Sequence, residues 1–187
     1  MRRAFKFQLL PNASQERRLT EWLEMCAGIY NQALENRVTD YRATGKGLSY
    51  NAQTRQLTVL RDESPAWTNV PVEIARSALH RLDRAFQAFF RRVKAGQKPG
   101  FPRFRSRGAY DSLSFPALAS TLRGNRVHVP HLGHVKDNLH REVSGDVKEV
   151  TIRRGVGGRW WVCFSCDLGE APPKVAVRSA VGIDLGL

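Results

Sequence analysis

The sequence has no long apolar run and few cysteines. No apolar stretch approaches the roughly 20 residues of a membrane span. The opening MRRAFKFQLL carries charge but lacks the apolar segment and the small-residue cleavage site of a signal peptide. Three cysteines, Cys26, Cys163 and Cys166, are too few for a disulfide framework. These absences predict a chain that does not enter a membrane and works in the reducing cytoplasm.

Several signatures of enzymes and metal proteins are also missing. The sequence contains no P-loop, no GxSxG and no HExxH. Cys163 and Cys166 form a CxxC pair, but zinc needs four ligands, and on a strand these positions point to opposite faces. We therefore interpret both cysteines as packing residues. Four histidines lie close together without a second cluster to complete a metal site, and we interpret them as surface residues, some of which contact RNA: His128, His131, His134 and His140.

Acidic residues are scarce relative to basic ones. The chain has 17 Asp and Glu against 30 Lys and Arg, a formal net charge of +13 at pH 7. Most of the basic residues are arginines, whose planar guanidinium suits bidentate phosphate contacts and stacking on bases. This excess indicates a nucleic-acid partner. A merely soluble basic protein is the alternative that composition leaves open.

The first half of the chain has the patterns of a strand followed by helices. Alternation over 2–10 predicts a strand that Pro11 ends. Asn12 with Gln15 three residues later matches a capping box, and an apolar stripe then predicts a helix that fades before Gly45. A shorter helix is expected over 51–61, with Leu57 and Leu60 facing inward. The clearest helix is 70–96, and its predicted buried stripe consists of Ala75, Leu79, Leu82, Phe86, Phe89, Phe90 and Val93.

The second half has a period of two. Residues 125–136 and 146–168 predict strands, the latter a hairpin turned by glycines. On its return strand Trp160, Val162, Phe164 and Cys166 share one face. Residues 169–180 have the Pro and Gly content of a linker. We expect the first strand to join this later sheet, so that the helices form an insertion.

A basic stretch, RRVKAGQKPGFPRFRSR, links the helical and the strand-rich halves. It holds seven basic residues and no acidic one, with Phe101 and Phe104 interleaved. Cations neutralise phosphates and aromatic rings can stack on bases. Packing of the two phenylalanines against the core is the favoured alternative for those residues. The predicted phosphate contacts come from Arg91, Arg92, Lys98, Arg103, Arg105 and Arg107.

The chain ends in VGIDLGL, an apolar strand pattern that carries Asp184. A carboxylate within a buried strand is costly to leave unpaired, and a metal ion is a suitable partner. Two-metal nucleases place carboxylates on central strands of an RNase-H-like sheet, where Mg²⁺ ions bind the attacking and leaving oxygens. Actin-like ATPases begin with a similar strand, so this motif alone leaves both options open.

Taken in order, these motifs resemble the N-terminal half of TnpB, the OrfB-type protein of bacterial insertion sequences and a relative of type V CRISPR effectors. The resemblance rests on RAFKFQLLPNASQE, YNQALENRVTDYRATGKGLSY, LHRLDRAFQAFFRRVKAGQKPGFPRFRSR, VHVPHLGHVK, VKEVTIRRGVGGRWWVCF and VGIDLGL. It implies an α+β fold with a discontinuous wedge-like antiparallel β-barrel (1–10 and 97–178). A helical recognition lobe with a helix-turn-helix (11–96) is inserted, and 179–187 begin a RuvC (RNase-H-like) nuclease domain.

The resemblance also implies a function: transposition-associated, RNA-guided DNA cleavage. Such proteins bind a guide RNA from the transposon end and pair it with target DNA, and the RuvC site cuts with Mg²⁺. Asp184 matches the first catalytic, metal-binding carboxylate. Tyr50, Thr54 and Arg76 match positions that contact the duplex beside the target, although Val72 nearby is apolar where a polar residue is expected.

The remaining carboxylates of such a nuclease lie further along the family's sequence than residue 187. One aspartate cannot hold two Mg²⁺ ions, so the chain is expected not to cleave DNA by itself and to need a C-terminal nuclease half as partner. The alternative is a stand-alone nucleic-acid-binding module, for instance a repressor without a nuclease. A ribosomal-type RNA-binding protein fits the composition but not the order of motifs.

Overall fold

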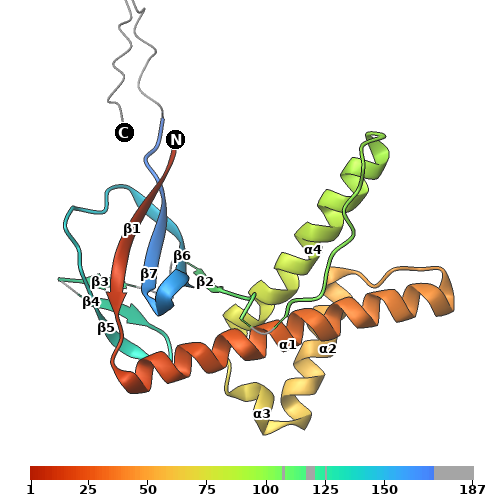
Figure 1. The fold of residues 1–187 in the computed structure, drawn as a ribbon, viewed down its shortest axis with the longest axis horizontal. Helices are drawn as coiled ribbons and strands as arrows, with labels where there is room; N and C mark the ends of the chain where they lie inside the picture. The colour runs from red at the N-terminus through yellow and green to blue at the C-terminus, as the bar shows by residue number, and fades with distance from the viewer. Residues whose placement is uncertain (107, 117–120, 125, 171–187) are drawn as a thin grey trace, which may run out of the picture.

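The computed structural model describes residues 1–106, 108–116, 121–124 and 126–170, and shows an α+β fold (Figure 1). Helix α1 begins beneath a curled antiparallel sheet and runs from there to the other helices, which lie to one side of the sheet. The helices are α1 (Ala13–Thr44), α2 (Tyr50–Glu63), α3 (Pro65–Thr68) and α4 (Val72–Lys94). Within the described residues, no helix is both long and apolar enough to cross a membrane.

The seven described strands form a single sheet in the order β2-β6-β7-β1-β5-β4-β3. All its pairings are antiparallel, and no described pairing joins the two edge strands. The described strands therefore form an open sheet, which Figure 1 shows to be curled, and its closure into a barrel is not seen in the described part of the chain. The strands are β1 (Arg2–Leu10), β2 (Ser112–Pro116), β3 (Thr121–Arg123), β4 (Arg126–Val129), β5 (Gly133–Asp137), β6 (Asp146–Arg154) and β7 (Trp160–Asp167).

The first strand of the chain lies at the centre of the sheet, between β7 and β5. Phe5, Phe7 and Leu9 alternate with more exposed residues and are buried, as the period of two predicts. Their neighbours on β7 continue the core with the predicted face of that strand, from Trp160 to Cys166. The helices are therefore inserted in sequence between two parts of one sheet. The wedge and recognition-lobe boundaries remain a prediction.

Helix α1 begins at the predicted capping box. The Asn12 side chain accepts from the Gln15 backbone N–H at 2.9 Å, and the Gln15 side chain accepts from the Asn12 backbone N–H at 3.1 Å. The helix ends at Gly45, whose φ of 69° is a left-handed conformation that suits glycine at a C-cap. The predicted second helix is present; Leu57 is buried as predicted, whereas Leu60 is 37% exposed.

Helix α4 extends well beyond the helices it packs on. Its stripe is buried as far as Phe86, whereas Phe90 and Val93 are 60% and 49% exposed. The prediction that these two residues are buried is wrong, and Phe89 is only half-buried. Figure 1 shows the reason: the C-terminal half of α4 projects away from α1, and only the chain that follows α4 runs back along it. A helical period specifies a face, but a face is buried only where another element covers it.

Candidate nucleic-acid interface

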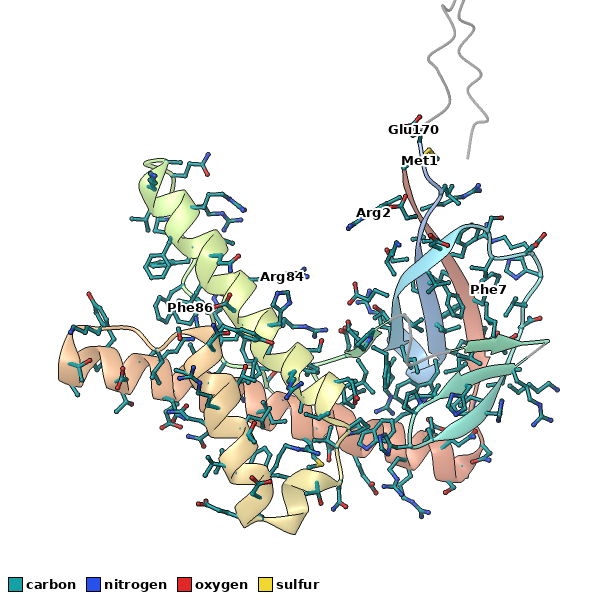
Figure 2. The ribbon with its side chains drawn as sticks, turned by 180° about the vertical axis from the view of Figure 1, so that it is seen from behind. Met1, Arg2, Phe7, Arg84, Phe86 and Glu170 are labelled. Carbon is teal, nitrogen blue, oxygen red and sulfur yellow. The ribbon has the colours of Figure 1, made fainter. Side chains whose placement is uncertain are left out.

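The basic stretch lies along the projecting half of α4 and the segment that returns from its tip (Figure 1). From residue 84 to residue 110 the sequence has no acidic residue. The described cations in this stretch are all exposed: Arg84, Arg91, Arg92, Lys94, Lys98, Arg103 and Arg105. Figure 2 shows Arg84 and Phe86 on opposite sides of α4, with Arg84 on the side toward the sheet. We call this surface, from Arg84 to Arg105, the basic arm.

The returning segment is held in place at two points. The Phe101 ring packs edge-on against the rings of Phe86 and Phe89, with centroid distances of 5.6 and 5.4 Å. Further along, the Asn31 side chain on α1 accepts from the Arg105 backbone N–H at 2.8 Å and donates to the Arg105 carbonyl at 2.9 Å. These contacts use only main-chain atoms of Arg105. Its guanidinium therefore stays available, 5.5 Å from the Tyr30 ring centroid.

At the base of the arm lies an open groove of about 750 Å³. Helix α1 forms one wall, and the 105–111 segment and the β6–β7 turn form the other. Two cations, Arg105 and Arg154, line it, and a Cβ added at Gly28 or Gly158 would meet no atom within 4 Å. The small residues leave room for a polymer backbone, and the arginines offer charge for phosphates. The full lining is Thr20, Leu23, Glu24, Ala27, Gly28, Asn31, Arg105, Gly108, Tyr110, Asp111, Arg154, Gly155 and Gly158.

Local contacts decide which groove charges remain available. Asp111 is paired with Arg153, whose Nη2 lies 2.7 Å from its Oδ2. The guanidinium of Arg154 lies 5.9 Å from the Trp160 ring centroid. Burial raises the pKa of the Tyr110 hydroxyl, so the phenol stays neutral at physiological pH. Asp111 is thus neutralised, and the described lining keeps the cations Arg105 and Arg154 beside one further carboxylate, Glu24, so that the groove favours an anion.

A second group of predicted residues lies at the junction of α2 and α4. The Tyr50 ring contacts His80 edge-on at 5.7 Å. The Thr54 hydroxyl donates to the Tyr50 carbonyl at 3.0 Å, which leaves its lone pairs free to accept. Arg76 is exposed one helical turn before His80. The N-terminal part of α4 therefore carries Arg76 beside His80, which contacts Tyr50. The C-terminal part of the same helix carries the predicted residues of the basic arm.

Two predicted residues, Arg107 and Asp184, lie outside the described residues. Among the residues that are described, no three His, Cys, Asp or Glu side chains come close enough to hold a metal ion. Sequence reasoning missed Arg154 and Asn31. Arg153 and Arg154 directly precede the glycines of a predicted hairpin turn, so a basic pair at the end of that hairpin was visible in the sequence. No local pattern marks Asn31.

The fold and this surface define a class: an α+β protein with a basic helical arm inserted into an antiparallel sheet. Residues 1–46 match the family model described as the helix-turn-helix domain of OrfB proteins of the IS605 type. In the structure the matched segment contains β1 and the single continuous helix α1. The turn after Gly45 and helix α2 complete a helix–turn–helix arrangement just beyond it.

Two curated proteins align with nearly the whole chain. "Putative RNA-guided DNA endonuclease InsQ" of Escherichia coli K12 is 29% identical over 98% of this chain and 45% of its own length. "Putative RNA-guided DNA endonuclease" of Streptomyces pristinaespiralis is 26% identical over all of this chain and 46% of its own length. The chain therefore matches an OrfB-type domain over its first 46 residues, is similar to these two proteins along its length, and spans about half of their length.

Proposed function

We propose that this chain is the nucleic-acid-binding part of a transposon-associated, RNA-guided DNA endonuclease of the TnpB/OrfB type. It binds the guide RNA and holds it for pairing with target DNA. One observation carries the proposal: the acid-free basic arm runs back from the tip of α4 to the groove that Arg105 and Arg154 line. The names of the two aligned relatives support the same reading.

The arm and groove have different roles in this proposal. The arm offers a row of exposed cations that follows a polyanion, and most of its binding energy is electrostatic. In the groove, the sugar-phosphate backbone of the RNA lies against the glycines, and the guanidinium groups of Arg105 and Arg154 bind its phosphates. Tyr50, Thr54 and Arg76 form a separate contact point, which we assign to the DNA duplex beside the target.

The curled sheet is proposed to be the wedge-like barrel of the family, with 179–187 as the start of a RuvC-like domain. Mg²⁺ would belong to that domain, and Asp184 is the ligand that the resemblance implies. Because Asp184 lies outside the described residues, its fit to a metal is not tested by this structure. Cleavage is therefore assigned to the RuvC-like domain as a whole, and these residues are assigned binding alone.

A salt titration of RNA binding tests the proposal. In the variant that combines Arg103→Gln and Arg105→Gln, two side-chain charges are lost while the main-chain bonds to Asn31 remain. If both cations contact phosphates of single-stranded RNA, the slope of log K against log[salt] should fall in magnitude by about 1.4. Fluorescence anisotropy with a labelled guide-length RNA, measured at several salt concentrations, gives this slope.

The matched control carries the same charge loss elsewhere. Arg17→Gln with Arg18→Gln removes two exposed cations from the first turns of α1, outside the arm and the groove. The control should leave the slope nearly unchanged. If the two double variants gave the same slope of log K against log[salt], RNA binding would depend only on the net charge of the protein. The proposed interface would then be wrong. Binding of the wild-type chain that does not weaken with salt would also refute it.

Asp184→Ala separates binding from cleavage. The substitution should leave RNA affinity unchanged, since no part of the proposed interface involves this residue. A large loss of RNA affinity would mean that Asp184 belongs to the binding surface and not to a nuclease site.

A further inference from the structure

The outer half of α4 carries an exposed cluster of aromatic rings. Phe90 is 60% exposed and Phe101 is 50% exposed. Their rings meet through Phe89, which lies 5.2 Å from Phe90 and 5.4 Å from Phe101, both edge-on. We call Phe89, Phe90 and Phe101 the aromatic platform. Below it Phe86 is buried, and its ring stacks against that of Phe90 at 6.2 Å.

Anchoring the loop accounts for only part of this cluster. Phe101 does hold the returning segment against α4, as the packing interpretation of the sequence requires. Phe90 has no such role, since its described ring contacts are to Phe86 and Phe89 on its own helix. The edge-on contacts hold the rings in defined orientations, and a large fraction of two ring surfaces faces solvent. The platform is therefore preorganised and uncovered.

The surroundings of the platform are wholly basic. Arg91, Arg92 and Lys94 complete the last turns of α4, and Lys98 follows in the loop. All four are exposed, and none of them forms an ion pair with a described acidic residue. Aromatic faces set among unpaired cations are the combination that binds single-stranded nucleic acid, where bases stack and phosphates pair with charge.

We propose that the aromatic platform stacks on unpaired bases of the guide RNA. This inference rests on the proposed function and adds a binding mode to it: base contact that requires single-stranded nucleotides. RNA is favoured over DNA because an exposed apolar patch is a liability in solution. In the proposed function the guide is bound before any target arrives. A partner that is always present covers the patch, whereas target DNA would cover it only briefly.

The test separates stacking from charge. Phe90→Leu and Phe101→Leu keep an apolar side chain but remove the aromatic ring. Phe90→Trp replaces the ring with a larger one on which a base can stack. Affinity is measured by anisotropy for a labelled 15-nucleotide uridine RNA, for an RNA duplex of the same length and for the deoxy version of the single strand. Tyr41→Leu is the control, because Tyr41 is a 61% exposed ring on α1 that does not belong to the platform.

Each leucine variant should weaken binding of the single-stranded RNA about tenfold, since stacking on one ring contributes about that much. The salt slope should stay the same because no charge is lost. Phe90→Trp should retain or strengthen binding, and Tyr41→Leu should have no effect. Affinity for the duplex should not change in any of these variants. Circular dichroism and thermal unfolding should show the same fold for all four proteins.

Distinct results would overturn this inference. Equal losses on duplex and single strand would show that the rings do not read unpaired bases, and a larger loss on the deoxy strand would reassign the platform to single-stranded DNA. Unchanged RNA affinity together with loss of a wild-type dimer in Phe90→Leu would make the platform a protein interface. If wild-type protein binds RNA but the leucine variants bind equally well, only this inference fails. If wild-type protein binds no nucleic acid, the proposed function fails first.

Discussion

A buried ion pair ties together the three long helices that carry the proposed interface. Arg37 on α1 is 8% exposed, and its Nη2 donates to Asp83 Oδ1 on α4 at 2.9 Å. Its Nε donates to Gln53 Oε1 on α2 at 2.6 Å, and its guanidinium lies 4.9 Å from the Phe86 ring centroid. Gln53 in turn donates to the Ala33 carbonyl at 2.7 Å. Every polar group named here has a partner, so the network is satisfied.

Replacing Asp83 alone should lower the free energy of unfolding more than replacing Asp83 and Arg37 together. Asp83→Leu leaves the Arg37 charge buried without a counter-charge, a situation that costs about 3–5 kcal/mol. For a chain of this size each kcal/mol lowers Tm by about 2–4 °C, so a fall of roughly 6–20 °C is expected. The double variant Arg37→Met with Asp83→Leu removes the uncompensated charge and should recover part of the loss, although the buried Gln53 Oε1 then loses its donor.

Thermal and urea unfolding followed by circular dichroism measure both variants, and the double-mutant cycle gives the coupling energy. Arg37→Met alone should cost less than Asp83→Leu, since Asp83 is 18% exposed and water can solvate it. If Asp83→Leu stays within about 1 kcal/mol of wild type, or the double variant is no better than the single one, the reasoning about a buried uncompensated charge is refuted.

The remaining predictions concern stability. Asp137 on β5 is buried, one of its carboxylate oxygens lacks a partner, and burial raises its pKa. The ionised form therefore destabilises the native state, so wild-type stability should rise as pH falls from the raised native pKa toward the unfolded value near 3.8. Asp137→Asn should be more stable at neutral pH and lack this rise, as urea titrations at several pH values will show. Gly145 has a φ of +81°, and a Cβ there would lie 2.5 Å from the Asp167 carbonyl oxygen. Gly145→Ala should lower Tm by several degrees, because strain of this kind costs about 1–3 kcal/mol. Asn12→Ala should cost about 1 kcal/mol by removing the capping bond, and Asn12→Ser, measured in the same unfolding assay, should cost less.

Local patterns predicted the elements that local interactions determine. The strand over 2–10, the capping box, the Gly45 end of α1 and the 146–168 hairpin all follow from residues within a few positions of one another. The buried stripe of α4 was predicted too far along the helix. Periodicity shows that Phe90 and Phe86 lie on one side, but the direction in which α4 leaves α1 decides which of the two is covered.

The candidate site shows the same division. The basic stretch was visible in the sequence because its cations lie within 17 residues that include no acidic one. The groove was not, since it brings Gly28 of α1 together with Arg105 and Arg154 from the loop and the sheet. That meeting depends on the path of the chain after α4 and on the pairing of β6 with β7. Such long-range contacts have no signature in a short window of sequence.

The central place of β1 has a consequence for how the protein is made. This strand is synthesised before the other described strands, yet Leu9 pairs with Trp160, and the other β7 partners come later still. At a synthesis rate of about 5–20 residues per second, roughly 8–30 seconds pass before that partner appears. The helices, whose contacts are local, can form during this interval. Phe5 and Phe7, whose cross-strand partners are on β7, meanwhile remain unpaired, so the nascent chain should depend on chaperones until β7 is synthesised.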